Sequence, residues 1–263
     1  MRKILLQVLF LCLCFSGNAQ RLLSWTPEFP LDNSTVAITV DCNKGNQGLL
    51  NYGGGNSSDV YVHVGVITNL STGPSDWKYT KFTWATTNPA AHATPLGSNK
   101  YLYAITDPRT FFGVPAGEII KKICVIFRNG AGTQKQVNSD NSDMYLPVYG
   151  STEYGVRLNL PPFEPRYIPW VEPINIAVGG NISITGVASV NSTLTLKLNG
   201  TTINTASNVN TISANPTINT SCAQQVMLEG NNGATIVKDS FSFYIAPTTT
   251  IAALPAGYRN RQA

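Results

Sequence analysis

Apolar and polar residues alternate along several short segments of this chain. Between Val60 and Val66 every even position is valine, whereas Tyr61 and His63 lie between the valines. Successive side chains of a β-strand point to opposite faces, so this pattern predicts a strand with a buried valine face. The other face should display Tyr61 and His63.

The same pattern recurs up to residue 150. Further strands are predicted at residues 36–40, 77–84, 100–105, 119–127 and 144–148. Gly- and Asn-rich turns separate them, and residues 107–113 are predicted to form a single helical turn. Short strands at this spacing are typical of an antiparallel β-sandwich.

A second set of alternating segments lies beyond residue 170. Its predicted strands cover residues 174–178, 181–185, 193–198, 201–205, 224–229 and 240–245. Asn199-Gly200 between two of these strands predicts a tight hairpin. The sequence therefore predicts an all-β chain of two tandem antiparallel immunoglobulin-like β-sandwiches joined by a Pro-rich linker, which holds four prolines between residues 160 and 169.

The N-terminus has the pattern of an export signal. A basic start at Arg2 and Lys3 precedes an apolar run that ends at Phe15, and small residues follow up to Ala19. We therefore expect a secreted protein, either extracellular or at the cell surface or in the periplasm, without a membrane span. The expected organisation is a signal peptide, a first sandwich, a linker, a second sandwich and a C-terminal linker or truncated start of a further domain, at residues 1–19, 20–150, 151–170, 171–247 and 248–263.

Composition argues against several functions. Charged residues make up 12% of the chain and the net charge is +4 without a basic tract, so nucleic acid is not an expected partner. There are two histidines, His63 and His92, and no serine stands in a nucleophile-elbow pattern. No carboxylate pair is singled out, so we expect no catalytic domain in this chain.

Metal and cofactor chemistry is not expected either. No close pair of cysteines suggests zinc, and the sequence leaves open whether Cys42 and Cys124 pair. Asp140, Asn141 and Asp143 are candidate calcium ligands, but the full calcium-binding loop of alternating ligands with a later bidentate Glu is missing. An Asx-rich turn is the interpretation that we favour there.

The remaining chemistry is aromatic. Rings stack against the flat C–H faces of sugars, while polar neighbours bind the hydroxyls. Candidate residues for such a site are Tyr61, His63, Trp77, Tyr79 and Trp84. The alternative is a structural spacer or protein-interaction module without sugar binding, in which Trp77 belongs to the core.

At these residues the chain resembles a known family. The stretches that carry the likeness start at Trp25 and Val40, at Asp59 and Ser75, and at Phe112 and Asp143. Together they resemble the N-terminal accessory region of secreted bacterial α-amylase-family enzymes (glycoside hydrolase family 13). The resemblance implies an accessory region that binds α-glucan, with a catalytic barrel domain following in a longer form.

The first predicted sandwich also resembles starch-binding modules of carbohydrate-binding families 25 and 26. By position, the resemblance gives His63 a hydrogen-bonding role, Trp77 a stacking role and Asn141 a contact with sugar hydroxyls. Those modules carry a second aromatic residue after a Phe-x-x-Gly turn. Here residues 132–135 are Gly-Thr-Gln-Lys.

Overall fold

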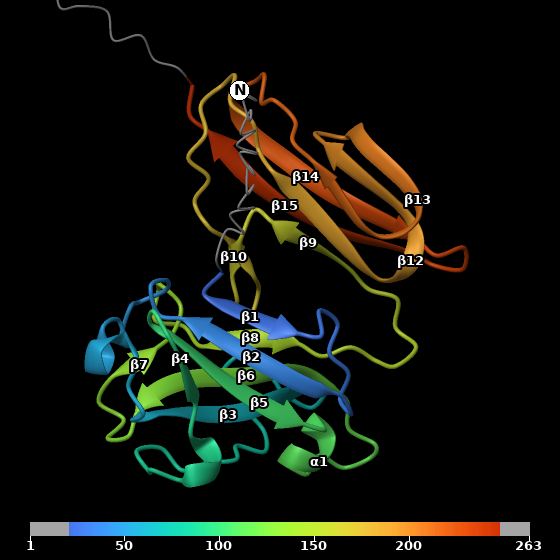
Figure 1. The fold of residues 1–263 in the computed structure, drawn as a ribbon. Coiled ribbons are helices and arrows are strands. Elements are labelled where there is room, and N and C mark those ends of the chain that lie inside the picture. The colour runs from blue at the N-terminus through green and yellow to red at the C-terminus, as the bar shows by residue number, and fades with distance from the viewer. Residues whose placement is uncertain (1–20, 248–263) are drawn as a thin grey trace, which may run out of the picture.

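The computed structural model describes residues 21–247, and their regular structure is almost entirely antiparallel β-sheet (Figure 1). In the first half, one sheet has the strand order β1-β2-β5-β4. Its strands are Leu23–Thr26, Thr35–Asp41, Lys100–Thr106 and Thr94–Gly97, in that order.

The second sheet of the first half is built around β6. This strand, Ile120–Asn129, pairs with β3 on one side and with β7 and β8 on the other. The partners are Val60–Thr68, Lys135–Gln136 and Met144–Pro147. Short helical turns connect the strands at Tyr52–Gly55 (η1), Pro89–Ala91 (η2) and Pro108–Phe112 (α1).

The two sheets enclose one apolar core, as the alternation predicts. Val60, Val62, Val64 and Val66 are fully buried, and they share this core with the apolar residues of β2. Tyr61 and His63 are only partly buried, on the opposite face of β3. The helical turn expected at residues 107–113 is present as α1.

The predicted strand at residues 77–84 is wrong. This segment runs beside the free edge of β3 and makes one isolated bridge, between Lys78 and Val66. The Lys81 N–H also donates to the Val64 carbonyl. Tyr79 has a positive φ of 52°, and this conformation interrupts an extended strand.

The second half consists of one continuous hydrogen-bonded sheet in the order β13-β12-β14-β15, with β9 also paired to β12. These strands are Thr201–Ala214, Ile184–Leu198, Cys222–Asn231, Ile236–Ile245 and Val156–Leu160, in the order just named. Asn199 and Gly200 form the predicted hairpin turn between β12 and β13, both with positive φ.

This single sheet folds over itself into two layers. The register of β12 against β13 shifts between Val187 and Leu194, and strands change layer at such irregularities. A side-chain carbon added at Gly186, before the shift, would lie 2.7 Å from Leu228 on β14. The start of β12 therefore faces β14 across a core of its own, and the sandwich class holds for this half too.

Two predicted strands of the second half need correction. Residues 174–178 form no strand, and at residues 181–185 only an isolated bridge at Asn181 precedes β12. Gly179 has a φ of 91°, so the backbone turns just where the two predicted segments would join. Residues 193–198 are the second part of the long strand β12.

The segment 151–170, expected as a linker, is more ordered than its prolines indicate. It contains β9, and Val156 and Leu158 of this strand belong to the second core. It also contains β10, Phe163–Glu164, which pairs with β11, Trp170–Val171. Phe163 packs into the first core, so the segment contacts both halves.

Within the described range the cysteines are not paired. Cys42 and Cys124 are buried and Cys222 is exposed, and all three thiols are free. Burial, and to a smaller extent the nearby charge of Asp41, raises the pKa of the Cys42 thiol to about 12. No helix among residues 21–247 is long and apolar enough to cross a membrane. The expected signal peptide and C-terminal segment lie outside the described residues.

Candidate functional site

The outer face of the β3–β6 sheet carries the candidate residues. In the strand register, Tyr61 on β3 lies opposite Arg128 on β6, and His63 lies opposite Ile126. All four side chains point away from the valine core because they occupy the alternate positions of their strands.

Two tryptophans from the segment beside β3 join this face. The His63 ring stacks on Trp77 with centroids 5.8 Å apart, and meets Trp84 edge-on at 5.3 Å. The guanidinium of Arg128 lies 5.5 Å from the Trp84 ring and 5.7 Å from the Tyr61 ring. We call Tyr61, His63, Trp77, Trp84 and Arg128 the aromatic patch.

Trp77 is held in place on several sides. Its indole N–H donates to the Tyr145 hydroxyl at 3.3 Å, and this hydroxyl donates to the Pro74 carbonyl at 2.7 Å. Gly65 makes room for the ring, since an added side-chain carbon there would lie 3.2 Å from Trp77 Cε3. Trp77 is therefore a half-buried support for His63.

Trp84 is the open ring of the patch, with 37% of the residue exposed. Arg128, itself fully buried, donates to the backbone carbonyls of Asn129, Gly130 and Thr86 at 2.7–3.1 Å. These bonds tie the loop after Trp84 to the end of β6. The exposed Trp84 indole therefore packs against a guanidinium whose position is fixed by these hydrogen bonds.

The electrostatics of the patch involve His63 and Asp143. Burial lowers the pKa of His63 below its usual 6.5, and the charge of Arg128 lowers it further. Burial raises the pKa of Asp143, while Lys135 and His63 act to lower it. The His63 imidazole beside the exposed Trp84 indole can exchange hydrogen bonds with hydroxyl groups.

We expect the lowered pKa of His63 to make the fold acid-sensitive. The unfolded chain takes up a proton near pH 6.5, whereas the folded chain resists it, so stability falls as the pH drops below 6.5. Urea unfolding at about pH 7.5 and about pH 5.5 should show this loss, and His63→Gln should reduce it.

His92→Gln is the matched control for that experiment. This variant should lose as much stability at the lower pH as the wild type does. Asp143 acts in the opposite direction, because a raised carboxyl pKa favours the folded state as the pH falls. His63→Gln removes one cause that lowers the pKa of Asp143, so this opposite effect grows in His63→Gln and reduces the acid loss further. An identical pH dependence in wild type and His63→Gln would contradict the assignment.

The structure brings together four of the six residues singled out from the sequence: Tyr61, His63, Trp77 and Trp84. Tyr79 is directed elsewhere, because its hydroxyl donates to Glu118 at 2.5 Å and its ring packs against the first core. The Thr68 hydroxyl donates to the same carboxylate.

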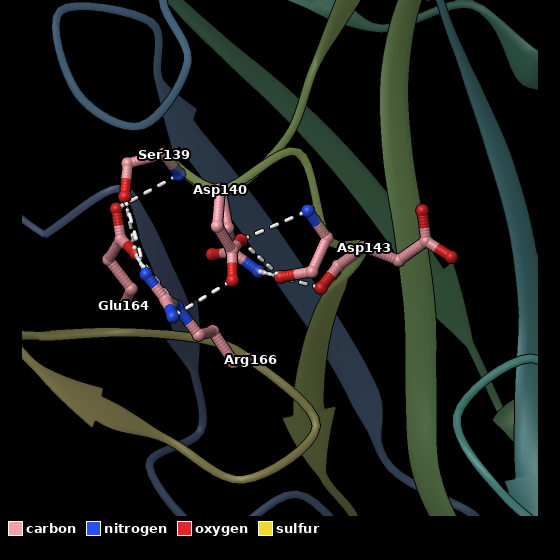
Figure 2. A network of polar contacts seen from close by, with 7 residues as sticks. Ser139, Asp140, Asp143, Glu164 and Arg166 are labelled. Carbon is pink, nitrogen blue, oxygen red and sulfur yellow. Dashed lines mark hydrogen bonds and ion pairs between the residues drawn. The ribbon is translucent and has the colours of Figure 1, made fainter.

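Asn141 lies in the turn between β7 and β8, with a φ of 65° and its side chain 3.4 Å from that of Asn46. Figure 2 shows the neighbouring network, in which Arg166 contacts Asp140 at 2.8 Å and Glu164 at 2.7 Å. The Asp143 carboxylate points away from this network. Asp143, not Asn141, is the residue of this turn whose charge acts on His63.

A calcium site has no support in this turn. Among residues 21–247, no group of three or more His, Cys, Asp or Glu side chains is arranged to hold a metal. Asp140 instead accepts hydrogen bonds from Ser142, as in the Asx-rich turn that the sequence favours.

Sequence reasoning missed two residues of this face, Arg128 and Asp143. Arg128 could have been found, because positions 124, 126 and 128 alternate in phase with the displayed side of β3. The sequence indicates Asp143 as a candidate calcium ligand and as part of the family resemblance, but not as a neighbour of His63. Its approach to His63 depends on the pairing of β8 with β6, which no local pattern shows.

The class of this protein follows from its own strands and cores, and comparison with known proteins adds no family to it. The strands and cores described above make the chain an all-β protein of the immunoglobulin-like sandwich class. No protein-family model and no curated protein matches the sequence. The comparisons do not link the chain to α-amylase-family enzymes or to starch binding.

Two similarities to solved structures are very low in identity. The fibronectin(III)-like modules of Clostridium thermocellum CbhA share 10% identity over 85% of this chain and 93% of theirs, with a TM-score of 0.25. The central fibronectin-III array of RIM-binding protein shares 11% identity over 86% of this chain and 68% of its own, with a TM-score of 0.24. TM-scores of this size carry no argument about function.

Proposed function

We propose that this chain is a non-catalytic carbohydrate-binding region whose aromatic patch binds α-glucan. The observation that carries the proposal is the Trp84 ring, 37% exposed beside His63 and above Arg128. A flat indole held rigidly at a protein surface suits the C–H face of a sugar ring.

The polar neighbours of Trp84 supply the second requirement. His63, a member of the patch, and Asp143, whose charge acts on it, offer donors and acceptors for sugar hydroxyls. Trp84 here takes the place of the second aromatic residue that starch-binding modules carry after their Phe-x-x-Gly turn. The choice of α-glucan and the link to a secreted α-amylase-family enzyme with a catalytic barrel depend on the sequence resemblance.

Trp84→Ala is expected to abolish most of the affinity for amylopectin. Loss of one stacking aromatic costs about 1–3 kcal/mol, or about 5- to 150-fold in affinity. Affinity electrophoresis in gels containing amylopectin measures it as lost retardation. Trp170→Ala removes a more exposed indole outside the patch and should leave retardation unchanged.

Two outcomes would count against the proposal. Equal retardation of wild type and Trp84→Ala would remove the aromatic patch as the site. Free migration of the wild-type protein would favour the alternative, a spacer or protein-interaction module without sugar binding.

A further inference from the structure

A cavity of about 380 Å³ lies between the two halves of the chain, separate from the aromatic patch. Residues of the first sandwich, of the connecting segment and of β15 line it together. Its aromatic wall is formed by Trp25, Tyr145, Tyr149, Phe163 and Phe241. A cavity of this volume and lining has the size and character of a small-molecule site.

Arg157 on β9 is the unusual group of this wall. The residue is 8% exposed, and its guanidinium lies 4.5 Å from the Trp25 ring and 5.9 Å from the Phe163 ring. One terminal nitrogen donates to Glu28 and Nε donates to Asn159 at 3.2 Å. The other terminal nitrogen, Nη1, is buried and has no hydrogen-bond partner among the described residues.

A buried guanidinium N–H without a partner is costly, so it favours an acceptor in its place. The best acceptor for an arginine N–H is a carboxylate oxygen, because both partners are charged. The protein supplies none at Nη1.

The other charges of the wall favour a single negative charge on the ligand. Arg166 and Lys238 are already paired, with Glu164 and Glu229, at 2.7 and 3.2 Å. Lys122 lies over the Tyr167 ring at 5.4 Å. Asp239 also lines the cavity, where it accepts the Leu158 N–H at 2.7 Å and would repel a second anionic group.

We propose that this cavity binds a small aromatic monocarboxylate. The carboxylate accepts the free N–H of Arg157, and the ring packs among Trp25, Phe163 and Phe241. The site shares Tyr145 with the support of Trp77 in the aromatic patch, but neither proposal requires the other.

Calorimetric titration of the full chain with 3-phenylpropionate and with its neutral amide tests the charge requirement. We expect the acid to bind about tenfold more tightly or better, because a hydrogen bond to a charged group is worth more than one between neutral groups. Equal affinity for the two compounds, or no binding of either, would overturn the proposal.

Arg157 also pairs with Glu28, so its replacement could unfold the protein. Ile168→Asp avoids this problem, because Ile168 lines the cavity but is 78% exposed. The new carboxylate should weaken the acid about fivefold through repulsion and leave the amide unaffected.

Ile119→Asp is the matched control, since Ile119 is 51% exposed and does not line the cavity. It should bind the acid as wild type does. Unchanged affinity for the acid in Ile168→Asp would place the binding elsewhere and overturn the site. Retardation by amylopectin should be the same in all three proteins.

Discussion

Phe127→Ala is expected to destabilise the first sandwich by about 3–5 kcal/mol, the cost of removing a large buried aromatic side chain. Phe127 is fully buried on β6, opposite Val62 on β3, and belongs to the core between the two sheets. The cavity left behind cannot be refilled by backbone collapse, because both sheets are held by their own ladders. Small domains are stable by about 5–15 kcal/mol, so this is a large share of the total.

Urea unfolding followed by tryptophan fluorescence measures this effect, because Trp25, Trp77 and Trp84 all lie in the first half. Tyr244→Ala is the control: Tyr244 is 62% exposed on β15, and its loss should change stability by about 0.5 kcal/mol or less. A loss below about 1 kcal/mol for Phe127→Ala would contradict the assigned core.

Strands that alternate in sequence could be predicted, and their buried faces with them. Val60 to Val66 shows why: a period of two decides which side chains are buried, and the valines need no information from distant residues. The Asn199-Gly200 hairpin is local in the same sense. Both residues adopt positive φ at little cost, so the turn is encoded where it occurs.

The failures arise where pairing between distant segments decides the structure. Residues 77–84 are rich in aromatic and β-branched residues, as strands are, yet the backbone at Tyr79 turns and the segment only follows the edge of β3. The prolines that flank Val156 to Leu160 suggested a linker, whereas β9 alternates and finds its partner in β12. Sequence pattern alone does not reveal that partner.

The candidate site divides in the same way. Tyr61, His63, Trp77 and Trp84 could be named because aromatic residues among polar ones stand out in a β-rich sequence. Their arrangement could not, because it depends on the empty space at Gly65 and on contacts from Arg128 and Tyr145. Asn141 was assigned by resemblance, and a turn of the chain carries it toward Asn46 instead.

Glu28→Gln is expected to weaken the contact between the two halves by about 2 kcal/mol, less than for a fully buried ion pair, because the Arg157 side chain is 10% exposed but the Glu28 side chain is 34% exposed. Glu28 accepts a hydrogen bond from Arg157 and lies 3.9 Å from Arg21. Burial lowers the pKa of Arg157 to about 9, and the nearby charge of Arg21 lowers it further. Without the Glu28 carboxylate, the repulsion between the guanidinium groups of Arg157 and Arg21 is offset less, and Asp239 is the negative charge that still acts on Arg157.

Urea midpoints measure this loss, and Asp32→Asn is its matched control. Asp32 pairs with Arg109 at 2.6 Å, but both side chains are about 30% exposed, at 33% and 28%. Such a pair should contribute about 1 kcal/mol or less. If the loss in Glu28→Gln comes from the unpaired charge, Glu28→Gln combined with Arg157→Met should recover part of it, since methionine removes the buried cation and its desolvation cost. Equal losses in Glu28→Gln and Asp32→Asn would mean that the Glu28–Arg157 ion pair is no stronger than a solvent-exposed ion pair.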